Sequence, residues 1–292
     1  MPYQSVFRPN LFQNKTMVVT GGGSGIGRCT AHELAALGAT VVLIGRNEDK
    51  LTKTVDEIQT DGGTANYFCC DIRQEASVKE TVENIVKQHT VIDGLVNNAG
   101  GQFPAPLSQI SQKGFETVVR TNLVGGFLMA REVFTQSMAK KGGAIVNIVA
   151  DMWKGMPIMG HSGAARAGMV NLTKTAAVEW ARSGVRVNAV APGWIASSGF
   201  DHYENSFKTL LPKLSQAVPL QRFGTESEVS AAIVFLLSDA AAFINGETIQ
   251  VDGAAPLSTV MWPMHGHQRS TPYNGFHRAK LPEVLMPQDE AE

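Results

Sequence analysis

A glycine-rich run near the start of the chain has the residue types and spacing of a turn that holds phosphates. The run GGGSGIG covers positions 21–27, follows the apolar stretch 17–20 and precedes a segment of helical period. Glycines let backbone amides approach a pyrophosphate, and the amino terminus of a helix adds partial positive charge. The run predicts a dinucleotide site that uses Gly21, Ser24, Gly25, Ile26 and Gly27.

The end of the second expected strand indicates which dinucleotide binds. Gly45 and Arg46 stand where an NAD site usually places an acidic residue against the ribose 2′-hydroxyl. A guanidinium binds a 2′-phosphate through paired hydrogen bonds, and no carboxylate is present here to repel it. We therefore predict NADPH (NADP+) as the cofactor, held by Arg46 with Arg28 as a second contact. The alternative for Arg46 is a solvated residue that caps the strand.

The segment HSGAARAG, at 161–168, holds the side chains best suited to act on a substrate. Ser162 and Arg166 are four residues apart and therefore share one face of a helix. The arginine carries a permanent cation that stabilises negative charge but does not readily release a proton. A serine hydroxyl is a far weaker acid than a phenol, whose pKa is about 10. The pair suits a developing anion better than proton transfer.

Seven apolar runs alternate with longer segments of helical period, which is typical of repeated βαβ units. The expected strands cover 17–20, 40–44, 65–69, 94–97, 144–149, 186–190 and 248–251. A helix is expected from HSGAARAG to about Arg182, with Gly184 ending it. We predict an α/β fold with a doubly wound, parallel, seven-stranded sheet and helices on both faces.

The chain has 292 residues, 43% of them hydrophobic, which is enough for one large core. We predict a single domain over 1–292 with its core at 10–253. The pattern loosens over 194–222, after the sixth strand, which suggests a lid over a substrate. A carboxy-terminal extension, 254–292, is rich in Pro, Gly and His, and we assign no regular structure to it.

Composition excludes several classes of partner. The formal net charge is -1 and no long block of like charge occurs, which argues against nucleic acid or an anionic membrane. No stretch approaches the roughly 18 apolar residues of a spanning helix. Cys29, Cys69 and Cys70 lack metal-ligand spacing and resemble reduced core thiols. With no secretory leader and the ending DEAE, we expect a cytoplasmic protein without a metal site.

The motifs resemble those of the short-chain dehydrogenase/reductase family over about 11–253. The matching segments are TGGGSGIG at 20–27, NNAG at 97–100, Asn122 in TNLVG, and APGWIAS at 191–197. The resemblance implies a Rossmann-type fold, with Asp71 either beside the adenine or as an ordinary strand-end cap. It implies further cofactor contacts from Ile72, Asn97, Ala99, Gly100, Arg166, Pro192, Gly193, Ile195 and Ser197.

HSGAARAG departs from this family where the catalytic tyrosine and lysine stand, because those positions hold Ser162 and Arg166. Ala150 takes the place of the family's serine, and Asn122 remains. The resemblance implies that Arg166 positions the ribose and charge, Asn122 holds a water or a helix bend, and Ser162 donates to the substrate oxygen. Such a site favours reduction of the C2=C3 bond of a 2-enoyl thioester, because charge then develops on the thioester oxygen.

GGQF after NNA, and HSGAARAG followed by NLTK, resemble peroxisomal trans-2-enoyl-CoA reductases and, more loosely, 2,4-dienoyl-CoA reductases. The resemblance implies an NADPH-dependent reductase of acyl-CoA-type substrates that forms a homo-oligomer, either a dimer or a tetramer. One alternative is an alcohol or aldehyde dehydrogenase of acyclic terpenoids, of the citronellol/citronellal type. Another is an NADP(H)-binding protein without turnover.

The proton donor stays open between Ser162, His161, Tyr203 and water. His161 reaches the site only if the helix begins after it, and otherwise it is a helix-entry residue that bonds backbone. The remaining candidates for substrate contact are basic residues for coenzyme A phosphates and apolar residues of the lid. They are Lys154, His202, Lys208 and Arg222 for the phosphates, and Trp194, Phe200, Phe207 and Leu210 for the lid.

Overall fold

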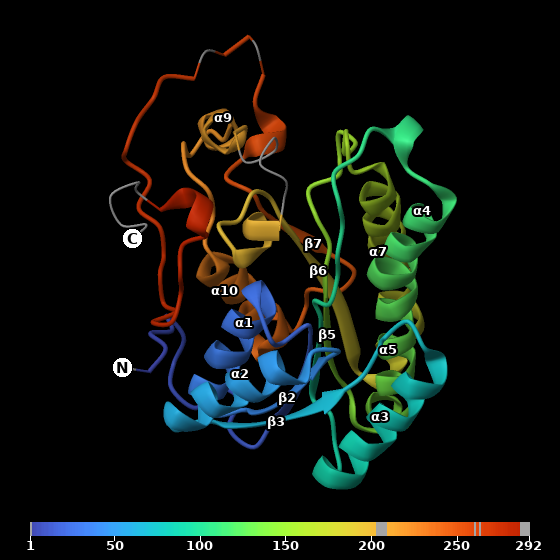
Figure 1. Ribbon diagram of the computed structural model, residues 1–292. Helices are drawn as coiled ribbons and strands as arrows, with labels where there is room; N and C mark the ends of the chain where they lie inside the picture. Colours follow the sequence, from blue (N-terminus) through green and yellow to red (C-terminus); the bar gives the residue numbers. More distant parts are fainter. Residues whose placement is uncertain (1, 203–208, 260, 263, 287–292) are drawn as a thin grey trace.

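Seven parallel strands form one sheet in the order β3-β2-β1-β4-β5-β6-β7 (Figure 1). The structure is a computed structural model that describes residues 2–202, 209–259, 261–262 and 264–286. The strands are β1 Thr16–Thr20, β2 Thr40–Gly45, β3 Thr64–Cys69, β4 Gly94–Asn97, β5 Gly143–Ile148, β6 Val185–Pro192 and β7 Thr248–Val251. The predicted doubly wound sheet is confirmed, and each expected strand differs from the observed one by no more than two residues at either end.

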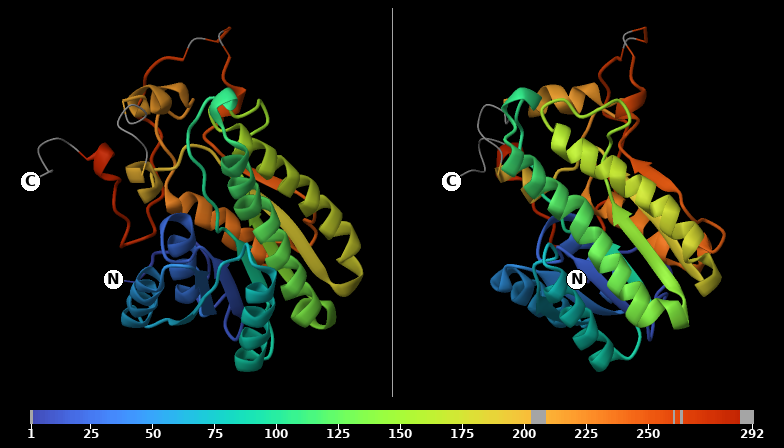
Figure 2. Two further views of the ribbon diagram at one scale, coloured as in Figure 1. Left: turned by 45° about the vertical axis from the view of Figure 1, so that its right-hand side comes forward. Right: turned by 90° about the vertical axis from the view of Figure 1, so that its right-hand side faces the viewer.

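Helices cover both faces of the sheet, as Figure 2 shows from two sides. One face carries α1 (Gly25–Ala36), α2 (Glu48–Thr60) and α10 (Glu226–Leu237). The other carries α3 (Glu75–His89), α4 (Gln112–Val119), α5 (Gly125–Val133) and α7 (Gly160–Glu179). The shorter helical segments are η1 Leu107–Gln109, η2 Arg120–Val124, η3 Phe134–Met138, α6 Ala139–Lys141, η4 Ala181–Ser183, η5 Ser198–His202, α9 Leu211–Ala217, η6 Asp239–Ala241, η7 Ala255–Leu257 and η8 Glu283–Leu285.

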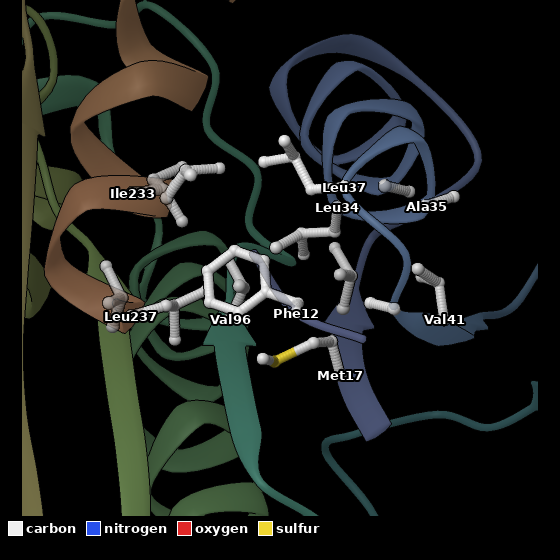
Figure 3. Close-up of a cluster of buried hydrophobic side chains, with 14 of the residues drawn as sticks. Phe12, Met17, Leu34, Ala35, Leu37, Val41, Val96, Ile233 and Leu237 are labelled. Atoms are coloured by element: carbon white, nitrogen blue, oxygen red, sulfur yellow. The ribbon is translucent and has the colours of Figure 1, made fainter. Parts of the chain in front are cut away.

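Two hydrophobic cores hold these layers together. Figure 3 shows the core between β1 and the helices α1 and α10, where Phe12, Leu34 and Leu237 meet. Because the sheet is covered on both sides, all five residues of β1 are buried and the strand needs no alternation of apolar and polar residues. The cores leave the carboxyl ends of the strands open for a ligand, at the point where the strand order reverses beside β1.

The helix predicted after HSGAARAG is α7, which begins at Gly160. Trp180 and η4 follow it, and Gly184 then adopts a left-handed conformation with φ of 71°. This conformation is unfavourable for residues with a Cβ, so glycine ends the helix as expected. On the same face, α4 and α5 are joined by η2, a π-helical turn that contains Asn122.

The carboxy-terminal extension runs over α9, descends along α1 to the amino-terminal arm and then turns back (Figure 1). The Gln4 backbone N–H donates to the Gly275 carbonyl at 2.9 Å, so the two ends of the chain lie side by side. The expectation of no regular structure here was wrong at η7 and η8, two single turns without a periodic sequence. Among the described helices, none has the length and apolar character to cross a membrane.

Candidate active site

A cavity of about 620 Å³ lies at the carboxyl ends of β4, β5 and β6. The strand ends supply it from positions far apart in the sequence, because parallel strands all end at the same edge. The predicted site residues that line it are Ile26, Gly100, Arg166, Pro192, Gly193, Ile195 and Ser197. Three further polar residues that the sequence did not single out also line it, namely Asn98, Gln102 and Asp151.

The glycine turn before α1 fits a pyrophosphate. Gly21 has φ of 67°, and a Cβ there would lie 2.9 Å from Asn98 Nδ2. A Cβ on Gly27 would lie closer still to the same amide nitrogen, so both positions require glycine. Ser24 begins the helix without a side-chain cap, which leaves the first amides of α1 available to an anion. The residues present therefore suit a dinucleotide.

Arg46 follows β2 with its side chain exposed, and it forms no ion pair with any described residue. Asp71, at the end of β3, is bound by Arg73 through contacts of 2.6 to 3.1 Å. Hydrogen bonds from Arg73 hold the pKa of Asp71 below its ordinary value. The expected second contact from Arg28 was wrong, because its Nε donates to Glu57 at 2.8 Å.

For two of the cofactor contacts implied by the resemblance, the side chains point into the interior, which leaves the backbone as the part that would meet a cofactor. The Asn97 side chain points into the interior, where Nδ2 donates to Asn147 Oδ1 at 2.9 Å and ties β4 to β5. Its neighbour Asn98 instead donates to the Thr20 carbonyl beside the glycine turn. Ile72 is buried beneath α5, so its side chain belongs to the core. Ala99 is held in place by its backbone N–H, which donates to Thr20 Oγ1 at 2.9 Å.

Arg166 is a half-buried cation that lines the cavity. Its Nη1 donates to the Ile148 carbonyl, while Nε has no hydrogen-bond partner among the described residues. Burial lowers the pKa of Arg166 to about 10, so the guanidinium stays charged near neutral pH. A Cβ on Gly100 would lie 2.5 Å from Arg166 Nη2 and 2.9 Å from Asn122 Oδ1, so glycine allows the three residues to pack together.

Asn122 does not line the cavity but fixes the loop that does. Its Oδ1 accepts from the Gly101 N–H and its Nδ2 donates to the Gly101 carbonyl, both at 2.9 Å. One side chain therefore bonds both the N–H and the carbonyl of Gly101. Asn122 lies on a π-helical turn, whose extra residue per turn directs the amide toward the loop. Asn122 therefore fixes Gly101, and with it the positions of the neighbouring residues Gly100 and Gln102.

Ser162 is fully buried, and its hydroxyl donates to Gln102 Oε1 at 2.6 Å. It does not line the cavity, whereas Gln102 does. The expectation that Ser162 touches the substrate oxygen is therefore corrected to an indirect role through Gln102. The sequence showed the serine's place on the helix, but it could not show that the loop after NNAG lies over that helix face.

His161 lies in the first turn of α7 and does not line the cavity. Its Nδ1 accepts from the Ser162 backbone N–H at 2.9 Å, and Phe103 packs edge-on with ring centroids 4.4 Å apart. This is the helix-entry role that the sequence left as the alternative. The condition for His161 to reach the substrate is not met, because the helix begins at Gly160, before His161.

Two aspartates, Asp151 and Asp252, lie at the carboxyl edge of the sheet. Asp151 follows β5 and Asp252 follows β7, with β6 between them. Burial, and then the nearby Asp252 charge, raise the pKa of Asp151. Asp252 Oδ1 accepts from the Ala254 N–H, while its buried Oδ2 has no partner among the described residues. Both acids follow the carboxyl ends of strands, a signal that the sequence already contained.

The segment after β6 supplies apolar walls. Trp194, Phe200 and Leu210 line the cavity, as expected of a lid. Tyr203, Phe207, Lys208 and the side chain of His202 lie outside the described residues. Lys154 is exposed beside an adjoining groove of about 480 Å³.

Arg222 is not available to a coenzyme A phosphate. Its guanidinium binds both carboxylate oxygens of Glu228, at 2.6 and 2.9 Å, and Nε donates to Ser270. The expected contact is therefore wrong, because an ion pair within the protein occupies this cation. No group of three or more His, Cys, Asp or Glu side chains suited to a metal ion occurs in the described part of the chain.

Comparisons with known proteins agree with this geometry. A family model described as "Enoyl-(Acyl carrier protein) reductase" matches residues 21–254. Peroxisomal 2,4-dienoyl-CoA reductase [(3E)-enoyl-CoA-producing] of Danio rerio is 33% identical over 260 residues, 88% of this chain and 86% of that protein.

Two solved structures have the same fold. The citronellol catabolism dehydrogenase (AtuB) of Pseudomonas aeruginosa PAO1 is 64% identical with a TM-score of 0.79, and the match covers 87% of this chain and 99% of that one. A structure from Beutenbergia cavernae with bound NADP is 32% identical with a TM-score of 0.80, covering 86% and 100%. The glycine turn, the strand order and these matches together show that the chain belongs to the short-chain dehydrogenase/reductase family.

Proposed function

We propose that this oxidoreductase uses NADPH to reduce the C2=C3 double bond of 2-enoyl-CoA thioesters. The observation that carries the proposal is the content of the cavity. It contains the guanidinium of Arg166, the amide of Gln102 and the carboxyl of Asp151, and no tyrosine among the described residues lines it. These groups serve a developing oxyanion and a separate proton better than the oxidation of an alcohol.

Gln102 and Arg166 are the proposed donors to the thioester oxygen. NADPH, when bound, supplies the hydride that adds to C3, and negative charge then develops on the oxygen. Ser162 donates to Gln102 Oε1 and so fixes the orientation of that amide beside the cavity. Arg166 contributes a full charge in a half-buried setting, where electrostatic stabilisation is stronger than in water.

Asp151 is the proposed source of the proton for C2. Its pKa is raised by burial and by Asp252, so it keeps a proton at a higher pH than an exposed aspartate. The negative charge of Asp252 disfavours an ionised Asp151. It therefore favours reprotonation of Asp151 from water after each turnover. This role replaces the candidates Ser162 and His161, which do not line the cavity.

Arg46 supports NADPH as the cofactor. It is exposed at the end of β2, where an adenosine 2′-phosphate would meet it, and no described acidic side chain pairs with it. The Beutenbergia cavernae relative contains NADP in the same fold, which is consistent with this choice.

A second candidate is a dehydrogenase of citronellol-type alcohols or aldehydes. The observation in its favour is the 64% identity with the citronellol catabolism dehydrogenase of Pseudomonas aeruginosa. This reaction needs an acid at the carbonyl oxygen, and Asp151 is the group that would have to provide it.

The two candidates differ in the carbon that receives hydride. We would follow NADPH absorbance with trans-2-enoyl-CoA thioesters, with free aldehydes that include citronellal, and with no substrate. Deuterated NADPH should place deuterium at C3 of the saturated thioester, and heavy water should place it at C2. Deuterium at C1 of an alcohol would instead establish aldehyde reduction. Tight NADPH binding without turnover of either class would make the protein a cofactor-binding partner.

The pH dependence of turnover tests Asp151. Turnover that needs protonated Asp151 should fall as pH rises through its raised pKa, and Asp151→Asn should be slow with little pH dependence. Asp252→Asn removes the repulsion that helps to raise this pKa, so the same fall should occur at lower pH. An unchanged profile in both variants would remove Asp151 from the mechanism.

A further inference from the structure

The extension beyond β7 is outside what this chain shares with its family. The family match ends at residue 254, yet the structure continues to 286. The match with the Pseudomonas structure covers 99% of that chain but 87% of this one. The match with the Beutenbergia structure covers 100% of that chain but 86% of this one. An added segment that adopts a defined path must be held by specific contacts.

A first group of contacts attaches the extension to the start of α10. Arg222 Nε donates to Ser270 Oγ at 2.9 Å. Thr225 Oγ1 donates to the Tyr273 carbonyl at 2.6 Å, and the Tyr273 N–H donates to Glu228 Oε1 at 3.2 Å. Thr225 and Glu228 are also the capping box of α10, so the extension docks on a rigid helix end.

A second group lies beside α1 and α2. The Phe276 ring is 2% exposed, and the guanidinium of Arg28 lies 4.9 Å from its centroid. Arg278 forms a bidentate pair with Asp61 at 2.8 and 2.9 Å, and His277 Nε2 is 2.9 Å from the same carboxylate. Arg278 holds the pKa of Asp61 below its ordinary value, so the pair stays charged at neutral pH.

From this second group the chain turns back to the substrate cavity. Pro282 is buried, η8 follows it, and η8 lies against η5. Val284 and Leu285 pack on the apolar cluster of Met159, Phe200 and Leu211. Met159 and Phe200 also line the cavity, so the two extension residues pack on a cluster that forms part of its wall.

We propose that Val284 and Leu285 set the depth of the acyl-binding end of the cavity. They are positioning residues that act through Phe200 and Met159. Phe200 cannot move outward while the side chains of Val284 and Leu285 fill the space next to it. Removal of those side chains lets Phe200 move. The extension therefore restricts the enzyme to shorter acyl chains than the cavity would hold without it. This inference rests on the proposed acyl thioester substrate.

The test compares chain-length preference in the full-length protein. Val284→Ala/Leu285→Ala is compared with Leu281→Ala, which alters an exposed residue of the same extension. Each is assayed with trans-2-enoyl-CoA thioesters of short, medium and long unbranched chains. In the double variant the kcat/KM ratio of long to short substrates should rise about tenfold or more, mainly through KM of the long ones. Leu281→Ala should keep the wild-type ratio.

Arg278→Ala is a second variant that leaves the wall residues intact. It releases the last anchor before η8, so the same ratio should rise by a smaller factor. The affinity for NADPH and the kcat with the short substrate should not change in either variant. An unchanged ratio, an equal loss with all chain lengths, or the same rise in Leu281→Ala would each overturn the proposal.

The pocket can also be tested without turnover. Calorimetric titration of saturated acyl-CoA thioesters of the same lengths, in the presence of NADP+, measures the same long-to-short ratio as binding. If the enzyme reduces only aldehydes, the same series is run with 2-enals. A ratio that changes in these assays supports the extension's role even where the thioester reaction fails, and an absence of any length-dependent binding overturns it.

Discussion

Ser162 occupies the position of the family's tyrosine, but its hydroxyl is buried and bonds to Gln102. The substitution therefore removes the phenol, and the side chain that lines the cavity beside this position is Gln102 of the neighbouring loop. Arg166 likewise keeps the lysine's positive charge, and it lies half-buried beside the cavity without a carboxylate partner among the described residues. A half-buried cation of this kind is costly unless a ligand supplies the negative partner.

Substitution of Gln102 and of Ser162 should have unequal effects. Gln102→Ala removes an oxyanion donor and should lower kcat about 10²- to 10³-fold with a smaller change in KM. Ser162→Ala removes only the group that orients this amide, and it should lower kcat roughly tenfold. Steady-state kinetics with one enoyl thioester measure both. An equal or larger loss in Ser162→Ala would mean that the hydroxyl itself reaches the substrate.

The cofactor preference should depend on Arg46. Arg46→Ala should lower the ratio of kcat/KM for NADPH over NADH by about 10- to 100-fold, because a charged hydrogen bond to the 2′-phosphate is lost. Lys53→Ala, an exposed cation on α2, serves as the control and should leave the ratio unchanged. Equal ratios in the wild type and Arg46→Ala would show that another group selects the cofactor.

Among the elements, α10 combines a regular cap with an unusual charge. Thr225 and Glu228 form its capping box, while Glu226 is the first helical residue. Burial raises the pKa of Glu226 to about 7, and the nearby Arg28 offsets this only in part. The carboxylate form therefore destabilises the contact of α10 with α1 at high pH.

Glu226→Gln should stabilise the protein increasingly as pH rises from about 4.5 to about 7, and fully above that range. The unfolded state ionises Glu226 near the ordinary glutamate pKa of 4.5, whereas the folded state does so near 7, so stability falls as pH rises between them. The variant avoids this loss and should gain about 1–3 kcal/mol at pH well above 7, and nothing at pH below 4.5. Thermal unfolding at both extremes is the measurement. An equal change of Tm at both would contradict the assignment.

The element positions were predictable because strand and helix patterns are local. The apolar runs and glycines located all seven strands and the end of α7. The proximity of Gln102 and Ser162 was not predictable, because it depends on the loop path between β4 and α4. Asp151 and Asp252 were recognisable as residues that follow strands, but the effect of the Asp252 charge on Asp151 emerges only from the assembled sheet.

At the scale of the whole molecule, the amino-terminal arm and the carboxy-terminal extension contact each other. Tyr3 and Phe276 lie stacked with ring centroids 5.9 Å apart, and the Tyr273 hydroxyl donates to the Gln4 carbonyl at 2.7 Å. The extension sequence has no periodicity, so its docking could not be read from pattern alone. Its contacts are instead a series of single polar and aromatic anchors.

Phe276→Ala should show how much this fastening contributes to stability. Loss of a buried phenyl ring typically costs about 3–5 kcal/mol, and the extension should become more sensitive to protease at the same time. Guanidinium unfolding and limited proteolysis measure the two effects. Trp262→Ala changes an exposed aromatic residue of the same extension and should alter stability by less than about 0.5 kcal/mol.

The place of η8 beside the cavity wall has a consequence for biosynthesis. Residues 283–286 leave the ribosome after all seven strands of the sheet, which are complete by Val251. The nucleotide-binding sheet can therefore assemble while its substrate pocket still lacks its backing. The substrate pocket is complete only when η8 has docked, so a chain truncated before residue 283 would carry an intact cofactor site and an unfinished specificity.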